Sequence, residues 1–233
     1  MPFSHPPIFW TRDSAGAVNG SQALVLLADL DDPTLGPLTS LLPTPEDLAR
    51  AATYPDARRG YFLARRALLR QLVARRFGCA AEAVVISVDE SGAPRIASPN
   101  EISPDANLRL SISRRGALVA LAIAPRPIGV DVEILGRPEE VPAAMLHKDE
   151  AERLADLNGA ARHKAFLEIW TLKEAYLKAL RTGLRREPAE IEVRWEDGQI
   201  RLFDRERPVA TTACDSRCEM LGAETIIAAC VLL

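Results

Sequence analysis

The sequence predicts an α+β protein in which both halves of the chain contain helices and antiparallel strands. Residues 56–77 and 161–180 place apolar side chains at helical spacing, so each segment is expected to form a long helix. Short runs rich in valine, isoleucine and leucine, separated by turn residues, are typical of antiparallel strands. Because each half holds both kinds of element, we expect two subdomains, formed by residues 1–124 and 125–233.

The N-terminal half is expected to begin with a strand within residues 21–30. A helix should open after Thr44, because threonine is a favourable N-cap residue. The long helix at residues 56–77 carries seven arginines and should end at Gly78, since glycine adopts the left-handed conformation of a helix C-terminus readily.

The remaining strands of this half are expected in pairs. Residues 83–96 predict a strand, a turn at Gly92–Pro94 and a short continuation. Residues 108–113 and 117–124 predict two paired strands, joined near Arg114–Gly116.

The C-terminal half is expected to begin with a strand at residues 128–134. Helices near residues 147–157 and 161–180 should follow, the second one ended by Gly183. Strands are then expected at residues 190–196, 199–204 and 224–233.

The composition indicates a globular protein. Hydrophobic residues make up 48% and charged residues 26% of the 233 residues. The net charge of −3 argues against a general nucleic-acid binder, which would be more basic. The longest apolar runs, residues 117–124 and 226–233, are far shorter than the roughly 20 residues of a membrane span. No membrane partner is therefore expected, and with no signal peptide recognised we expect the protein in the cytoplasm.

Two pairs of charged residues deserve separate interpretation. Asp131 and Glu133 are two residues apart in an expected strand, so they point to the same face. A strand with one face in water would look the same. Glu174 and Lys178 are four residues apart in an expected helix and share a helix face. A surface ion pair would also have this spacing.

Taken together, these residues indicate a metal site. Asp131, Glu133 and Glu174 could form the oxygen cage that Mg²⁺ accepts, with phosphate oxygens and water completing it. Lys178, one turn beyond Glu174, could then meet a phosphate or a leaving group. The combination indicates a phosphoryl-type transfer, although the spacing alone does not bring the residues together.

Two motifs carry a family resemblance. The segments "IGVDVE" (residues 128–133) and "WTLKEAYLKALRTGL" (residues 170–184) resemble the signature of the 4'-phosphopantetheinyl transferases, specifically the Sfp type within the holo-acyl-carrier-protein synthase superfamily. Three further segments resemble motifs of that family: "DARRGYFLARRALLR", "GAPRI" and "LSISRRG". The resemblance extends from about residue 58 to residue 184.

The resemblance implies a function and a fold. Such enzymes transfer the phosphopantetheine arm of coenzyme A to a serine of an apo acyl or peptidyl carrier protein, and release adenosine 3',5'-bisphosphate. The expected fold has two similar α+β subdomains related by pseudo-two-fold symmetry, with coenzyme A between them. The protein is expected to be a monomer, with coenzyme A and the carrier protein as partners and no nucleic acid.

The resemblance also implies roles for single residues. Asp131, Glu133 and Glu174 would bind Mg²⁺, with Mn²⁺ as a possible substitute. Glu174 would help to deprotonate the carrier serine as a general base. Lys178 would stabilise charge on the pyrophosphate, which makes Glu174, Lys178 and Asp131 the expected catalytic set. Lys173 would be a second phosphate contact. Further contacts to coenzyme A are expected from Ser113, Arg114, Arg58, Arg65 and Arg95.

Two positions depart from the family pattern. Arg114 stands where the family has histidine, and arginine can grip phosphate with two N–H groups while staying charged at every pH. It could also be an ordinary turn residue. Ala93 stands where the family has lysine. Arg95, two residues on, would share its strand face and could substitute for that lysine, or could simply be solvated.

Two alternatives remain open at this point. The loss of a lysine at Ala93 is compatible with a relative that binds coenzyme A but transfers nothing. The retained acids and Lys178 argue against that alternative, because a binder without catalysis need not keep them. A nucleic-acid module that uses the arginine-rich helix at residues 56–77 would conflict with the net charge.

Overall fold

The computed structural model describes residues 8–11, 23–90, 92–97, 108–137, 139–196, 199–207, 215–221 and 225–233. The chain divides into two compact units. The first unit is formed by residues 1–112 and 116–125, and the second by residues 113–115 and 126–233. Helices and antiparallel strands occur in both, so the α+β class predicted from the sequence is confirmed. The subdomain boundary predicted after residue 124, and the pseudo-symmetry, stay predictions.

A four-stranded sheet forms the base of the first unit. Its order is β1 (Ile8–Thr11), β2 (Leu24–Asp29), β6 (Leu118–Ala124) and β5 (Arg109–Arg115). Strands β1 and β2 pair antiparallel, as do β2 and β6. All seven residues of β6 are buried, which explains its unbroken apolar sequence. Strand β1 was not predicted from the sequence.

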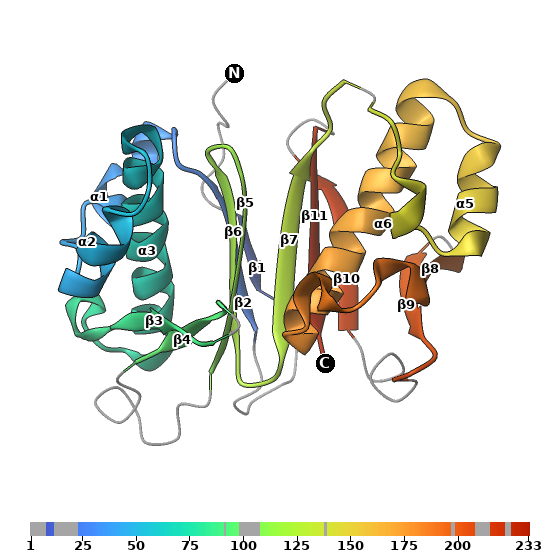
Figure 1. The fold of residues 1–233 in the computed structure, drawn as a ribbon. Helices are drawn as coiled ribbons and strands as arrows, with labels where there is room; N and C mark the ends of the chain where they lie inside the picture. Colours follow the sequence, from blue (N-terminus) through green and yellow to red (C-terminus); the bar gives the residue numbers. More distant parts are fainter. Residues whose placement is uncertain are drawn as a thin grey trace. The chain divides into compact units, whose positions relative to one another are not determined.

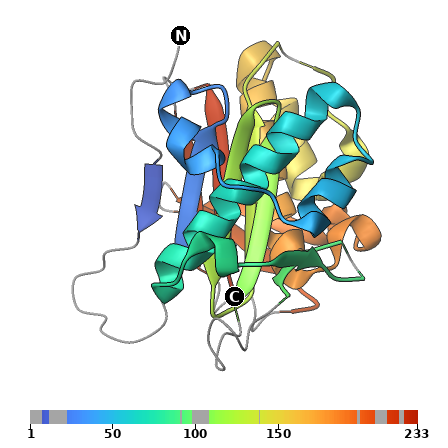
Figure 2. The ribbon, with the colours of Figure 1, turned by 90° about the vertical axis from the view of Figure 1, so that its left-hand side faces the viewer.

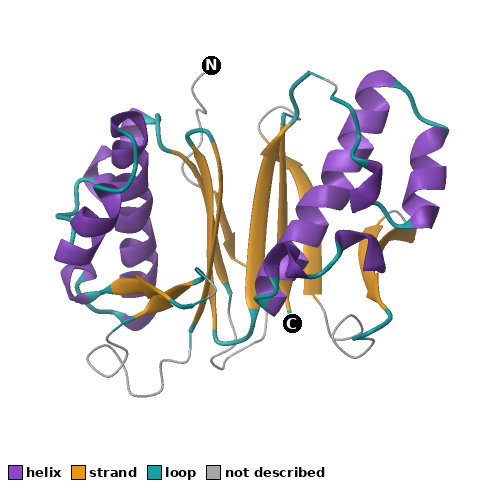
Figure 3. Ribbon diagram, in the orientation of Figure 1, coloured by secondary structure: helices purple, strands orange, loops and turns teal. Residues whose placement is uncertain are grey.

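Helices of the first unit lie on one face of this sheet (Figure 3). The longest, α3 (Asp56–Phe77), runs diagonally across the sheet (Figure 2) and ends at Gly78, whose φ of 65° confirms the predicted C-terminus. Helix α2 (Pro45–Ala51) has the predicted cap, because the Thr44 side chain accepts a hydrogen bond from the backbone N–H of Asp47. The smaller elements are η1 (Pro33–Leu35), α1 (Gly36–Thr39), η2 (Ala81–Ala83) and the hairpin of β3 (Ile86–Val88) and β4 (Pro94–Ile96).

Two arginines of α3 are structural. Arg66 is buried, donates from Nε to Asp47 Oδ1 over 2.6 Å, and also donates to the carbonyl of Ile86. Arg70 is buried as well and donates to the carbonyls of Leu42 and Ala81, over 2.7 Å and 3.1 Å. These two side chains tie α3 to its neighbours, so they belong neither to a solvated helix face nor to a docking surface.

The second unit is built on a three-stranded antiparallel sheet of order β10 (Asp215–Leu221), β11 (Ile226–Leu232) and β7 (Ile128–Ile134). Its register places Asp131 opposite Ala229. The sequence did not predict β10, because its segment "DSRCEML" lacks the run of β-branched residues by which strands are recognised.

Helix α6 (Gly159–Leu180) packs on β7 and β11 (Figure 1). It ends at Leu180, as predicted, but the residue that caps it is Arg181, which takes the left-handed conformation with φ of 58°, and not Gly183. The remaining elements are η3 (Ala143–Met145), α5 (Lys148–Ala155), η4 (Gly183–Arg185), η5 (Pro188–Glu190) and the hairpin of β8 (Ile191–Glu196) and β9 (Gln199–Asp204). None of the helices among the described residues is long and apolar enough to cross a membrane.

The contact between β7 and α6 depends on Gly129. A Cβ atom at this position would lie 1.8 Å from the carbonyl oxygen of Ala175 and 2.6 Å from the backbone nitrogen of Ala179. Both distances are far below van der Waals contact, so only glycine lets the helix backbone approach the strand this closely. The small side chains of Ala175 and Ala179 belong to the same close approach.

We expect Gly129→Ala to lower the free energy of unfolding by about 3 kcal/mol, the upper end of overpacking costs, because the methyl group meets backbone and not a movable side chain. Urea unfolding measures this change. The matched control is Gly60→Ala in α3, where nothing lies within 4 Å of the added Cβ. That change should stabilise the protein by about 1 kcal/mol. Equal stability of the two variants would contradict the close approach at Gly129.

Candidate active site in the second unit

The side chains of Asp131 and Glu133 project from β7 on the same face of the strand, as the alternation of a strand requires. Asp131 is 4% exposed, and Glu133 is half-buried. Each carboxylate meets a basic side chain of the same unit. Lys178 Nζ lies 2.6 Å from Asp131 Oδ1, and Arg115 Nε lies 3.2 Å from Glu133 Oε2.

Lys178 connects β7 with α6 and with the end of β5. Its ammonium group donates to Asp131 Oδ1 and, over 3.2 Å, to Ser113 Oγ. Ser113 Oγ in turn donates to Asp131 Oδ1 over 2.6 Å. Glu174 Oε2 lies 3.8 Å from Lys178 Nζ, one helical turn away. The structure therefore brings Ser113, Asp131, Glu174 and Lys178 together.

One oxygen of this cluster has no hydrogen-bond partner among the residues that the structure describes. Asp131 Oδ2 is buried and accepts no hydrogen bond from any residue that the structure describes. A buried carboxylate oxygen without a donor is costly, so it is normally paired with a hydrogen-bond donor or a cation. Asp131 Oδ1, by contrast, already has two donors. Oδ2 is thus the atom of Asp131 that is available to a ligand.

The electrostatics of the cluster favour a bound cation. Burial, and secondly the negative charge of Asp131, raise the pKa of Glu133, against the opposing effect of Arg115 and Lys178. Burial also raises the pKa of Glu174, with Lys178 opposing and Asp131 reinforcing the shift. Three carboxylates thus repel one another in a partly dry setting. Oxygen donors of this kind suit Mg²⁺, and Oδ2 of Asp131 is available to such an ion, but the three acids do not form a group whose ligand atoms all lie within 4.8 Å of one another.

The sequence interpretation missed Arg115. It lies two residues beyond Ser113 in β5, so both side chains point to the face that meets β7. Residues two apart in a strand share a face, so the expected role of Ser113 could have pointed to Arg115. Arg114 lies between them, is exposed, and points to the opposite face of β5. Its contact with coenzyme A stays a prediction.

Lys173 does not join the carboxylate cluster. Its side chain is fully buried, and Nζ donates to Glu150 Oε2 over 2.6 Å and to the carbonyl of Met145 over 3.1 Å. In this arrangement the ammonium group cannot reach a phosphate, and the expected second phosphate contact is corrected accordingly. The reason is helical geometry, because Lys173 points about 100° away from its neighbour Glu174.

Three residues expected to contact coenzyme A lie in the first unit. Arg58 is exposed in the first turn of α3, and Arg65 places its guanidinium 5.4 Å from the ring centre of Phe62. Arg95 in β4 is exposed, with Nε donating to Ser87 Oγ over 3.1 Å. Their roles toward coenzyme A stay predictions.

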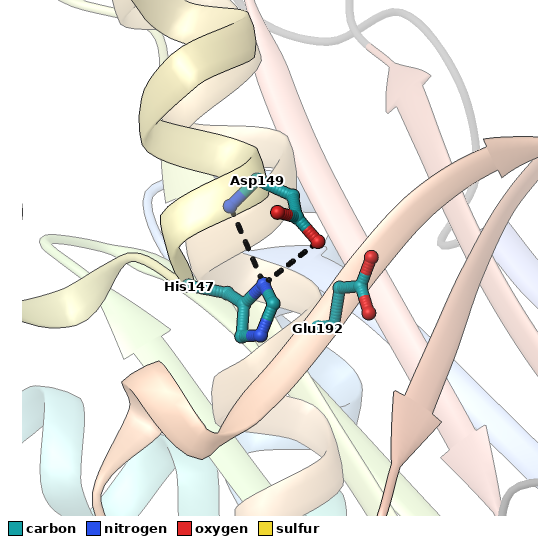
Figure 4. A group of neighbouring side chains, drawn as sticks. All are labelled: His147, Asp149 and Glu192. Carbon is teal, nitrogen blue, oxygen red and sulfur yellow. Dashed lines mark hydrogen bonds and ion pairs between the residues drawn. The ribbon is translucent and has the colours of Figure 1, made fainter.

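A second group of possible metal ligands lies at the start of α5 and in β8 (Figure 4). It consists of His147, Asp149 and Glu192. His147 Nδ1 lies 3.5 Å from Asp149 Oδ2, and both oxygens of Glu192 accept hydrogen bonds from Arg194, over 2.6 Å and 2.7 Å. Arg194 therefore already balances the charge of Glu192, and we assign no metal to this group.

The known proteins to which this chain is similar are 4'-phosphopantetheinyl transferases. The family model of the 4'-phosphopantetheinyl transferase superfamily matches residues 127–230, which include β7 and α6. A putative 4'-phosphopantetheinyl transferase of Synechocystis sp. is 31% identical over 169 residues, 70% of this chain and 66% of that protein. The 4'-phosphopantetheinyl transferase HetI of Nostoc sp. is 34% identical over 147 residues, 60% of each protein. The chain thus spans slightly less than two thirds of these relatives.

A solved structure was also compared. The crystal structure of a holo-(acyl-carrier-protein) synthase from Bacillus anthracis in complex with CoA (3',5'-ADP) matches with a TM-score of 0.35 and 23% identity, over 46% of this chain and 94% of that one. By the family model and the curated relatives, the chain is similar to the 4'-phosphopantetheinyl transferase superfamily. The resemblance drawn from the two motifs is confirmed at this level, and the Sfp type stays a prediction.

Because burial raises the pKa values of Glu133 and Glu174, we expect the affinity of the site for a divalent cation to depend on pH. Protons compete with the cation, so affinity should fall as pH falls, and the fall should begin above the ordinary glutamate pKa of about 4.3. Electron paramagnetic resonance of Mn²⁺ titrations across pH measures this. Glu133→Gln is the control, with weaker binding and a shallower pH dependence. An Mn²⁺ affinity that stays constant until the pH reaches the ordinary glutamate pKa would contradict the assignment of Glu133 and Glu174 as cation ligands.

Proposed function

We propose that the protein transfers the 4'-phosphopantetheine arm of coenzyme A to a serine of an apo acyl or peptidyl carrier protein, with Mg²⁺, and releases adenosine 3',5'-bisphosphate. The observation that carries the proposal is the partly buried cluster of Asp131, Glu174 and Lys178, with Glu133 beside it. These are the positions at which the two family motifs place their acids and lysine. The similarity of the chain to the 4'-phosphopantetheinyl transferase superfamily supports the same reaction.

The reaction replaces the phosphoanhydride bond of the pyrophosphate by a phosphoester bond to the serine. The serine oxygen of the carrier attacks the phosphorus next to the pantetheine group, and the bond from that phosphorus to the bridging pyrophosphate oxygen breaks. Mg²⁺, held by Asp131, Glu133 and Glu174, would neutralise the oxygens of the pyrophosphate. The serine proton passes to Glu174, directly or through water.

Lys178 has a second task in this scheme. In the structure its ammonium group is held by Asp131 and Ser113. With a cation held by Asp131, Lys178 would be free to turn toward the substrate and to stabilise the negative charge that develops on the leaving bisphosphate. Ser113 keeps its hydrogen bond to Asp131 and so fixes the orientation of the carboxylate.

Recognition of coenzyme A is proposed for Ser113 and Arg114 of the second unit and for Arg58, Arg65 and Arg95 of the first. Arg114 would hold a phosphate group through paired N–H donors. Arg95 would compensate for the missing lysine at position 93, where Ala93 has no charge to offer. We propose that the protein acts as a monomer.

A second candidate is a relative that binds coenzyme A without transferring it, and Ala93 motivates it. The two candidates differ in one measurement. The protein is mixed with coenzyme A, Mg²⁺ and a panel of apo carrier proteins, and each carrier is weighed by intact-protein mass spectrometry. A gain of one phosphopantetheine that chelator abolishes supports the transferase. Binding of coenzyme A without any gain on the panel supports the second candidate.

Removal of a metal-binding acid should abolish transfer. We expect Asp131→Ala or Glu174→Ala to reduce the rate by at least about 100-fold, because each removes charge stabilisation at the reacting phosphates. Thermal unfolding should show that both variants stay folded. Glu168→Ala, on the same helix and outside the cluster, is the matched control and should keep its activity. Near-normal turnover in either acid variant would contradict the metal assignment.

Replacement of Arg114 should act on binding. We expect Arg114→Ala to raise KM for coenzyme A about 10-fold or more, with a smaller effect on kcat, because a charge-assisted hydrogen bond to phosphate contributes about 1.5–3 kcal/mol. Arg114→His is the informative control, since histidine loses its charge near pH 6.5. Its KM should rise with pH, whereas that of the original protein should not. An unchanged KM in Arg114→Ala would make Arg114 an ordinary turn residue.

A further inference from the structure

A buried ion pair lies in the second unit, outside the cluster described above. Lys173 of α6 is fully buried and Glu150 of α5 is 1% exposed. Lys173 Nζ lies 2.6 Å from Glu150 Oε2. The proposed reaction uses neither side chain, although Lys173 directly precedes Glu174.

Glu150 accepts hydrogen bonds from elements that pack around α6. Its Oε1 accepts a hydrogen bond from the backbone N–H of Val193 in β8, and its Oε2 accepts one from that of His147 before α5, each over 2.7 Å. Lys173 also donates to the carbonyl of Met145 in η3. The ion pair therefore connects α6 with α5, β8 and η3.

Stability alone gives no reason for charges at this place. Burying two charges costs desolvation energy, and an apolar pair of the same volume often packs equally well or better. A charged pair does provide direction, because its hydrogen bonds require defined angles and distances. Successive residues of a helix differ by about 100° around its axis, so a fixed Lys173 also fixes the directions of Glu174 and Lys178.

We propose that Glu150 and Lys173 are positioning residues, which set the rotation of α6 so that Glu174 and Lys178 face Asp131. Lys173 thus serves the site through the helix and not as a contact to phosphate. Tyr176 adds a second fixed point, because its hydroxyl donates to Asp204 over 2.6 Å. Glu174 accordingly lies between two anchored residues of the same helix.

The test removes both charges with Lys173→Met/Glu150→Gln and reads Mn²⁺ affinity, kcat and KM separately. We expect Mn²⁺ affinity and kcat to fall by at least about 10-fold, as is typical when the support of a metal ligand is removed. KM for coenzyme A should stay within about 2-fold. The control is Arg66→Met/Asp47→Asn, which removes a buried ion pair of the first unit and should leave Mn²⁺ affinity unchanged.

Glu150→Asp covers the case in which the double variant does not fold. It keeps both charges but shortens the reach by one methylene, so a positioning role requires weaker Mn²⁺ binding here as well. Wild-type Mn²⁺ affinity and kcat in a folded variant would overturn the proposal, and so would a rise in KM alone, which would indicate a phosphate contact.

The expected changes in kcat and KM rest on the proposed function. If the unaltered protein modifies no carrier, the proposed function fails, whereas the Mn²⁺ measurement still decides the positioning role.

Discussion

The backbone contact between β7 and α6 at Gly129 is the constraint on which the second unit depends. Without a Cβ at this position, the carbonyl of Ala175 and the nitrogen of Ala179 can lie against the strand. The same close approach brings Lys178, one residue before Ala179, to Asp131, two residues after Gly129. Gly129 is therefore a packing residue that also matters for the site, because the close approach it allows sets the distance between Asp131 on the strand and Lys178 on the helix.

The carboxylate cluster is assembled at a cost. Burial and mutual repulsion raise the pKa values of Glu133 and Glu174, so the folded state favours their protonated forms. Lys178 and Arg115 offset part of the negative charge. An oxygen of Asp131 nevertheless has no donor among the described residues. A cation bound here, as we propose, would remove repulsion that Lys178 and Arg115 offset only in part.

The two lysines of α6 show why a motif does not assign roles by itself. Lys173 and Lys178 both belong to the segment that resembles the family signature, and both were expected to contact phosphate. The structure separates them, because Lys173 is buried against Glu150 while Lys178 reaches Asp131 and Ser113. Their spacing of five residues turns them to different sides of the helix. The two lysines therefore differ in role because different elements pack against these two sides of α6.

The sequence by itself determined the α+β class and the long helices α3 and α6, and it predicted the acids and lysine of the site, because periodicity and motifs are local in the chain. The sequence did not predict strand β10, because this segment becomes a strand only through pairing with β11. The sequence did not identify Arg115 either, because its role depends on the ion pair with Glu133 from another strand. Tertiary structure alone decided the burial of Lys173 and the unpartnered oxygen of Asp131, because both result from contacts between segments far apart in the chain.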